Sequence, residues 1–304
     1  MRSTRHNSQA AIIFFAVLSF FLTLPTKTHA GLLDQQSICM EAMLVQCLPR
    51  NVINLVTNIP GDILSTAAYP FSRERYRRTA LDFALTLASM SADPTLGPPI
   101  WNLSDWSGDV GMRPQTVQDW YIPGFLFYDS IMTYALPVLH VSAAVANDPR
   151  LYRSTYLGMK VWAYSIFVPI PFRYAVQRSY PYSKSGELNS PYEFHSSDHY
   201  DRNQSVLAEA GSFPSFRAAM WFGLADVFAA EYGSGYGWYG AASALTLLAD
   251  HRHWPSDLLF GSLVGLSVGQ SIRTRYGQSG SANFDFLPFV TPNFIGITFQ
   301  KPLN

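Results

Sequence analysis

The chain has 304 residues, of which 48% are hydrophobic and 15% aromatic, and its 21 basic side chains balance 21 acidic ones. This hydrophobicity without net charge excludes a disordered chain, which needs the opposite composition. The lack of a basic excess argues against nucleic acid as a partner. Because only 14% of residues are charged, the chain can bury a large core. Its length fits two average domains or one large helical domain.

The first 30 residues have the pattern of a secretory signal peptide. Arg2 and Arg5 form a basic start, an apolar run covers 10–24, and the segment ends at Ala30. An uncleaved anchor is the alternative, although about fifteen apolar residues are few for a membrane span. Cleavage would remove Arg2, Arg5 and Lys27, so that 18 basic and 21 acidic side chains would leave a net charge of −3. We therefore expect an exported protein, periplasmic or associated with the cell envelope.

Cys39 and Cys47 follow the predicted signal peptide, and export would allow them to form a disulfide. On one continuous helix, eight residues would place their Cα atoms about 12 Å apart, too far for a disulfide. A disulfide therefore needs a break in the helix between them. Two free, buried cysteines are the alternative.

Apolar stretches of helical length follow, separated by Pro, Gly and Ser clusters. They predict an all-α fold, with helices over 40–57, 74–92, 125–146, 154–178, 215–232, 238–250 and 255–274. Near the end, Phe284–Val290 and Phe294–Gln300 flank Thr291-Pro292-Asn293 and predict a short β-hairpin. Long loops are expected over 93–123 and 179–212, and loops of this length in a compact domain usually serve a function.

Two segments of eighteen residues, Ser130–Asn147 and Tyr232–Ala249, contain no charged side chain. We interpret them as buried core helices, and composition leaves peripheral membrane contact open as the alternative. The loop over 179–212 contains two histidines and two aspartates, at His195, Asp198, His199 and Asp201. Such a set could ligate a metal ion, but a polar surface loop explains it more simply, and we predict no metal site.

The clearest chemical motif is His253-Trp254-Pro255-Ser256-Asp257, which precedes an apolar stretch. Proline is favoured at the first helical position and aspartate in the first turn, so we expect a helix to begin near Pro255. Asp257 could then hold one imidazole nitrogen of His253 and leave the other free to attack. The helix N-terminus also offers N–H groups to an anion. The alternative is a helix cap beside a surface histidine.

Three arginines lie in two further motifs. Phe213-Pro214-Ser215-Phe216-Arg217 repeats the aromatic-Pro-Ser opening before another apolar helix, and Arg217 could clamp an anion bidentately. Arg173 and Arg178 end the helix predicted over 154–178, where cations are favoured in any case. Ordinary capped helices are the alternative explanation for both motifs.

In this order and spacing, the three motifs resemble the superfamily of type 2 phosphatidic acid phosphatases, bacterial non-specific acid phosphatases and vanadium haloperoxidases. Its signature is K-x6-R-P, then P-S-G-H, then S-R-x5-H-x3-D, and HWPSDLLFGSLVG is very similar to the last of these helices. The resemblance covers about residues 55–300 and includes a weaker match at Ile59-Pro60-Gly61-Asp62. It implies a multi-helix bundle of that kind over 55–304, with the hairpin at its end, after a lead-in over 31–54.

The resemblance also implies roles for individual residues. His253 would be the nucleophile that forms a phosphohistidine, and Asp257 would orient it. Ser215 would bind phosphate oxygens together with nearby backbone amides, and Arg173 stands where the superfamily has Lys. Arg217 and Arg178 are further candidates for phosphate binding. The implied partner is a phosphate ester or phospholipid-type substrate.

The pattern fails at three places. The first-motif Arg falls on Tyr180, the Gly-His of the second motif on Phe216-Arg217, and the Ser-Arg of the third on Thr246-Leu247. Two phosphate-binding arginines and the general acid are therefore missing where the superfamily has them.

Two functions remain open. The first is hydrolysis of phosphate monoesters, lipid phosphates among them, with altered or reduced activity. The second is an inactive relative that binds phosphorylated or lipid ligands or has a structural role in the envelope. A vanadate-dependent haloperoxidase is disfavoured because vanadate needs the same depleted cationic cage, so we predict no cofactor.

Overall fold

The computed structural model describes residues 38–40, 43–73, 75–105, 132–181, 188–194, 211–233, 236, 253–277, 285–291 and 294–300. Its helices are α3 (Leu44–Thr57), α4 (Ile59–Ala68), α5 (Tyr76–Asp105), α7 (Pro149–Phe167), α8 (Ile170–Val176), α10 (Phe216–Tyr232) and α12 (Pro255–Arg275), with a 3-10 turn, η1 (Tyr69–Phe71), after α4. Residues 132–145 are helical as well. The prediction of an all-α fold is confirmed for this part of the chain. The predicted signal peptide and the helix expected over 238–250 lie outside the described residues.

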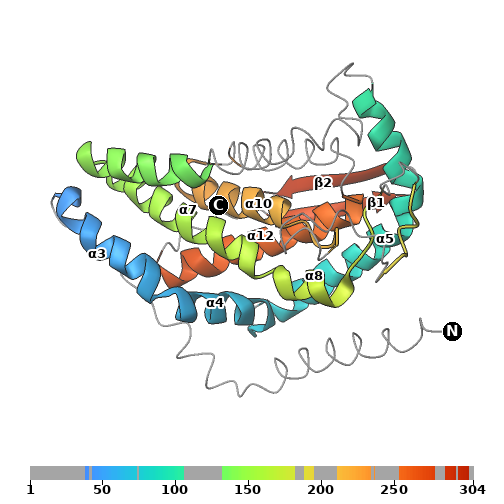
Figure 1. Cartoon of the computed structure of the whole chain (residues 1–304), viewed down its shortest axis with the longest axis horizontal. Helices are drawn as coiled ribbons and strands as arrows, with labels where there is room; N and C mark the ends of the chain where they lie inside the picture. Colours follow the sequence, from blue (N-terminus) through green and yellow to red (C-terminus); the bar gives the residue numbers. More distant parts are fainter. Residues whose placement is uncertain are drawn as a thin grey trace, which may run out of the picture.

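The centre of the molecule is a bundle of α7, α10 and α12 (Figure 1). α10 packs along both α12 and α7, while α5 and α4 cover other parts of α12. The main hydrophobic core lies among these helices and consists of Tyr156, Leu157, Val161, Tyr164, Val227, Val268, Ile272 and Tyr276. The bundle places the start of α12 beside the start of α10, where two of the sequence motifs lie.

Glycines on α12 allow its backbone to approach α10 closely. A Cβ atom on Gly261 would overlap the Ser215 carbonyl, and one on Gly265 would overlap the Ala219 carbonyl. Both glycines lie on one face because they are four residues apart. Their close contact with α10 fixes the Ser215 motif against the His253 motif.

Several predicted helix boundaries were wrong, and two helices differ most from the prediction. The helix expected over 154–178 is divided into α7 and α8, because Pro169 has no N–H group to continue the hydrogen-bond ladder. The helix expected over 74–92 continues to Asp105, through part of the segment we expected to be a surface loop. Asp93, just past the predicted end, is fully buried and accepts a hydrogen bond from α12. This contact anchors α5 at Asp93, although a proline is the next residue. The remainder of that loop, 106–123, lies outside the described residues.

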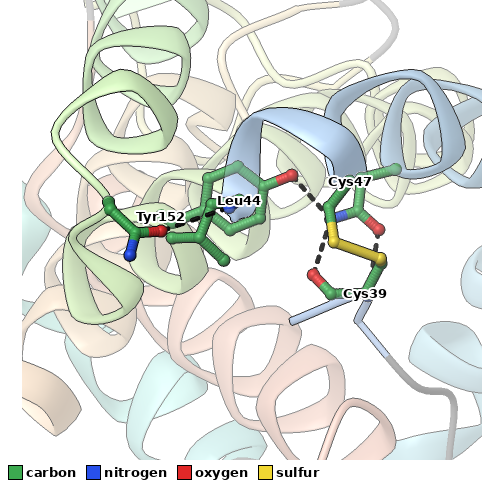
Figure 2. Close-up of a disulfide and its surroundings, with 6 residues drawn as sticks. Cys39, Leu44, Cys47 and Tyr152 are labelled. Atoms are coloured by element: carbon green, nitrogen blue, oxygen red, sulfur yellow. Dashed lines mark hydrogen bonds between the residues drawn. A yellow bond between two sulfur atoms is a disulfide. The ribbon is translucent and has the colours of Figure 1, made fainter. Parts of the chain in front are cut away.

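A disulfide joins Cys39 to Cys47, with their Cα atoms 5.5 Å apart (Figure 2). The break that a disulfide requires is present, because α3 begins at Leu44 rather than at residue 40. Asn51 of α3 donates to the Cys39 carbonyl and to the Tyr152 hydroxyl, which ties this corner to α7. The alternative of two free cysteines was wrong. α3 also runs across residue 55, where we place the start of the domain, so the division at 54/55 stays a prediction.

The C-terminal strands β1 (Asp285–Thr291) and β2 (Phe294–Gln300) pair antiparallel. Asp285 lies opposite Gln300, and Thr291 lies opposite Phe294. The two connecting residues lie outside the described part, so the hairpin turn itself stays a prediction.

The uncharged helix over 132–145 is not the buried core helix that we expected. One face is buried through Leu136, His140, Ala143 and Ala144. The opposite face is exposed and apolar, and it carries Tyr134, Val138, Val141 and Val145, the last with 72% of its surface accessible. Helical spacing places these four on one stripe. None of the helices in the described residues is long and apolar enough to span a membrane.

Candidate active site

The first turn of α12 fixes the clearest motif. Trp254 precedes Pro255, the first helical residue, and its N–H donates to Asp257 Oδ2 at 2.9 Å. The Asp257 N–H donates back to the Trp254 carbonyl at 3.0 Å. These two bonds cap the helix and hold Asp257, which is fully buried. His253, immediately before the cap, is also buried, so the alternative of a surface histidine was wrong.

The His253 ring is oriented by a carbonyl group. Its Nδ1 lies 3.0 Å from the Ser212 carbonyl oxygen and 3.9 Å from Asp257 Oδ2. A carbonyl only accepts hydrogen bonds, so Nδ1 carries the proton and the neutral ring keeps its lone pair on Nε2. Asp257 is too far away for a hydrogen bond and acts on the ring through its charge. The nitrogen left free is the one that a nucleophilic role requires.

The Ser212 carbonyl is itself held in place. The Ser212 N–H donates to the Arg178 carbonyl at 2.8 Å, and its hydroxyl donates to the Ser179 carbonyl at 3.1 Å. Gly211, one residue earlier, has φ +88°, and a Cβ atom there would overlap the Arg178 backbone. Glycine is therefore required where this segment turns toward His253.

Burial and charge keep His253 neutral. Burial lowers its pKa, the Asp257 carboxylate opposes that effect, and the positive charges of Arg173 and Arg217 lower the pKa further. Burial alone would raise the pKa of Asp257, but the positive charge of Arg178 and the Trp254 N–H together hold it below its ordinary value. The pair is thus an ionised carboxylate beside an uncharged imidazole.

Arg173, at the end of α8, is the strongest candidate for anion binding. Its Nη2 donates to the Gly211 carbonyl and to the Tyr180 hydroxyl, the latter at 3.3 Å. Its Nε and Nη1 are buried and have no hydrogen-bond partner among the described residues. Buried donors in this state are costly unless a ligand completes them. Arg173 therefore offers two donor nitrogens in a position where its charge also reaches His253.

Ser215 and Arg217 lie at the start of α10. Ser215 is the N-cap, and its hydroxyl oxygen accepts from the Ala218 N–H at 3.3 Å. Its own N–H donates to the Asp257 carbonyl at 3.1 Å, so the starts of α10 and α12 are joined directly. Arg217, in the first turn of α10, is half-buried and acts electrostatically on His253. Arg217 therefore acts on His253 through its charge, whereas Ser215 is joined to Asp257.

Arg178 has protein partners. Its Nη1 donates to Asp257 and to the Ser256 hydroxyl, Nη2 donates to Asp93, and Nε donates to the Pro191 carbonyl. We predicted that Arg178 binds phosphate directly, but its three guanidinium nitrogens donate to groups of the protein, Asp257 among them. Sequence analysis missed Asp93 because it lay in an expected loop, and no local pattern marks a partner 163 residues away along the chain.

The departures from the superfamily's pattern surround Arg173. Tyr180, at the place of the first-motif Arg, accepts a hydrogen bond from Arg173. The Phe216 ring, at the place of the second-motif Gly, lies 5.0 Å from the centre of the Arg173 guanidinium. Thr246 and Leu247, at the place of the third-motif Ser-Arg, lie outside the described residues.

His195, Asp198, His199 and Asp201 also lie outside the described residues, and the described part holds no group of three or more metal ligands.

Comparison with known proteins gives one partial match. The chain is 38% identical over 68 residues to a lipid A 1-phosphatase of Porphyromonas gingivalis. The matched segment covers 20% of this chain and 15% of that protein. No family model matches the chain, and no solved structure matches it.

Proposed function

We propose that this chain is an exported phosphohydrolase of the type 2 phosphatidic acid phosphatase kind, which cleaves phosphate monoesters through a phosphohistidine at His253. The observation that carries the proposal is the state of His253, whose Nδ1 proton is committed to the Ser212 carbonyl while the charges of Arg173 and Arg217 act on the ring. A neutral imidazole with a free Nε2 beside two cations suits attack on a phosphate.

The proposed reaction has two steps. His253 Nε2 attacks phosphorus, a P–N bond forms, and the P–O bond to the leaving alcohol breaks. Water then attacks phosphorus, the P–N bond breaks, and inorganic phosphate leaves. Arg173 and Arg217 would neutralise the charge on the transferring group in both steps.

The leaving alkoxide must obtain a proton from solvent, because the guanidinium of Arg217 does not give up its own. A positioned general acid is worth roughly 10²- to 10⁴-fold in rate. We therefore expect esters with acidic leaving groups to be the best substrates.

Three observations support a lipid phosphate as the substrate and an exported location. The partial relative is named as a lipid A phosphatase. The exposed apolar stripe over 132–145 would suit contact with lipid. The Cys39–Cys47 disulfide is typical of proteins in oxidising compartments, which agrees with the signal peptide predicted over 1–30.

A second function, phosphate-ester binding without turnover, is favoured by the surroundings of Arg173. Tyr180 and Phe216 contact Arg173, whose Nε and Nη1 have no hydrogen-bond partner among the described residues, and the residue in place of the general acid is Arg217. A binding protein of this kind would hold a phosphate ester with an affinity that Arg173→Ala weakens, while releasing no phosphate.

Phosphate release from an activated aryl phosphate, and from phosphatidic acid in detergent, tests the first function. We expect His253→Ala to abolish release, because no other group supplies the nucleophile. His140→Gln, which changes a buried histidine outside the site, should leave release unchanged in protein that is folded. No release by the unaltered chain above the level of His253→Ala would reject the phosphatase and leave the binding protein.

A further inference from the structure

A buried chain of charged groups connects α5 to the candidate nucleophile. Arg178 Nη2 donates to Asp93 Oδ2 at 2.6 Å, and Arg178 Nη1 donates to Asp257 Oδ1 at 2.7 Å. The side chains of all three residues have no accessible surface. Two carboxylates from different helices thus share a single guanidinium, and the second of them lies beside His253.

The hydrogen bonds define the charge on Asp93. Arg178 is always protonated and can only donate. The Ser256 hydroxyl accepts from Arg178 Nη1 at 2.6 Å and therefore donates its own hydrogen to Asp93 Oδ2. The Ser256 N–H donates to Asp93 Oδ1 at 3.0 Å. Asp93 receives three donors, and a proton on its carboxyl group would find no acceptor among them, so the arrangement favours the ionised carboxylate.

We propose that Asp93 is a positioning residue of the active site, which holds Arg178 against Asp257 and supplies the negative charge that sets the basicity of His253. The proposal rests on the proposed function in taking His253 as the nucleophile. Asp93, Arg178 and Asp257 together carry a net charge of −1. This charge opposes Arg173 and Arg217, the two cations that lower the pKa of His253.

The structure shows which charged groups face His253 at one end of this series of ion pairs and Asp93 at the other. His253 is faced by Asp257 from α12, Arg173 from α8 and Arg217 from α10. Asp93 is faced by Arg178 and, more weakly, by Asp257: burial raises the pKa of Asp93, Arg178 opposes that effect, and the Asp257 charge adds to it. Loss of the Asp93 charge would leave Arg178 to neutralise Asp257 alone. The cations would then act on His253 with less opposition, so its pKa should fall.

Asp226 provides a matched control. It is buried and accepts two hydrogen bonds from Arg273, at 2.8 and 3.1 Å, so Asp226→Asn also removes a buried carboxylate from a guanidinium on α12. Arg273 is twenty residues beyond His253, about 30 Å along the helix axis. A purely structural role for Asp93 predicts that both substitutions leave the His253 pKa unchanged.

The test is an NMR titration of the histidine rings, in which the signal absent from His253→Ala identifies His253. We expect Asp93→Asn to lower the titration midpoint of His253 by roughly half a unit to one unit, and Asp226→Asn to leave it in place. Asp93→Glu, which keeps the charge, should retain the unaltered midpoint and decides the matter if Asp93→Asn does not fold. An unchanged or raised midpoint in Asp93→Asn, or a lowered one in Asp93→Glu, overturns the proposal.

Kinetics provide the second arm. Asp93→Asn should lower kcat with little change in KM, and it should move the acid limb of the kcat/KM profile to lower pH. The titration needs no turnover, so it judges Asp93 even if no form of the chain releases phosphate. Absence of release would reject the proposed function alone.

Discussion

The two ends of α12 hold buried charges in opposite ways. At the far end, the carboxylate of Asp62 accepts hydrogen bonds from Lys160 at 2.6 Å, Tyr164 at 2.9 Å and Tyr276 at 3.0 Å. Arg275 Nε forms an ion pair with the same carboxylate at 2.8 Å. Burial lowers the pKa of Lys160, while the Asp62 carboxylate raises it. Asp62 thus has its positively charged and hydroxyl partners within the protein.

The first turn of α12 is incomplete by comparison. Asp257 is paired, but Arg173 keeps two buried nitrogens without a partner in the described part of the chain. His253 keeps its Nε2 lone pair because Nδ1 carries the proton. Asp257 and Arg275 are about 27 Å apart along the helix. One helix can therefore be stabilised at one end by the cluster around Asp62, the closed cluster, and carry function at the other end, the open site at His253 and Arg173, where a ligand would supply the missing partners.

Asp62→Asn is the largest test of the closed cluster. It leaves Lys160 and Arg275 without their anion in a buried place, and removing one partner of a buried ion pair costs about 3 to 5 kcal/mol. Urea unfolding should show a loss of this size in the free energy of unfolding. Phosphate release by the protein that remains folded should be unchanged, because the substitution is a helix length away from His253.

Glu231→Gln is the matched control for Asp62→Asn. Glu231 lies 3.8 Å from both Arg150 and Arg153, whose side chains are largely exposed. Such surface pairs contribute less than about 1 kcal/mol. A loss as small as this in Asp62→Asn would contradict the view that the closed cluster stabilises the fold.

Arg173→Met should have the opposite signature at the open end. Removing a cation that faces a transferring phosphoryl group costs roughly 10²- to 10³-fold in rate. The protein should nevertheless unfold at the same temperature or a higher one, because two unpaired buried donors disappear. Phosphate release and a thermal melt measure the two effects. Arg173→Lys, which restores the superfamily's residue, should retain part of the activity. A melting temperature that falls together with activity would show that Arg173 is structural.

The parts of the site that sequence predicted are those with local signals. Pro255 at the first helical position and Asp257 in the first turn place His253 just before α12, and Ser215 marks the start of α10 in the same way. These positions depend on backbone groups within three residues. The C-terminal part of α5, after residue 92, was not predicted because Pro94, Pro98 and Pro99 are typical of a loop. In the structure, hydrogen bonds between Asp93 and residues far along the chain support a helix there.

Long-range pairing also decided the role of Arg178. Its position at the end of a helix is equally compatible with a phosphate ligand and with a buried ion pair. The fold decides between them, because it packs α5 and α12 together and so brings the carboxylates of Asp93 and Asp257 to Arg178. The disulfide was similar, since the spacing of Cys39 and Cys47 required a break that only the start of α3 at Leu44 could reveal.

The smallest expected effect concerns His140, a buried histidine outside the candidate active site. Its ring stacks on Tyr152 at 4.1 Å, and its Nδ1 donates to the Tyr152 carbonyl at 3.1 Å. Burial lowers the pKa of His140 to about 4, although the bond to the carbonyl opposes this. The unfolded chain has the ordinary value of about 6.5. The folded state thus favours the neutral ring.

The direction in which stability changes with pH follows from the difference between the folded and unfolded pKa values of His140. The contribution of His140 to stability is fully present above pH 6.5 and is lost as the pH falls through 4, by up to roughly 3 kcal/mol. Urea unfolding at pH 7, 6, 5 and 4 should show this loss, and His140→Gln should reduce the slope because no ring remains to be protonated. Burial also lowers the pKa of His253, so His253→Gln should remove a separate part of the slope. If His140→Gln retains the full slope, the loss of stability at acid pH comes from the open site at His253 rather than from His140.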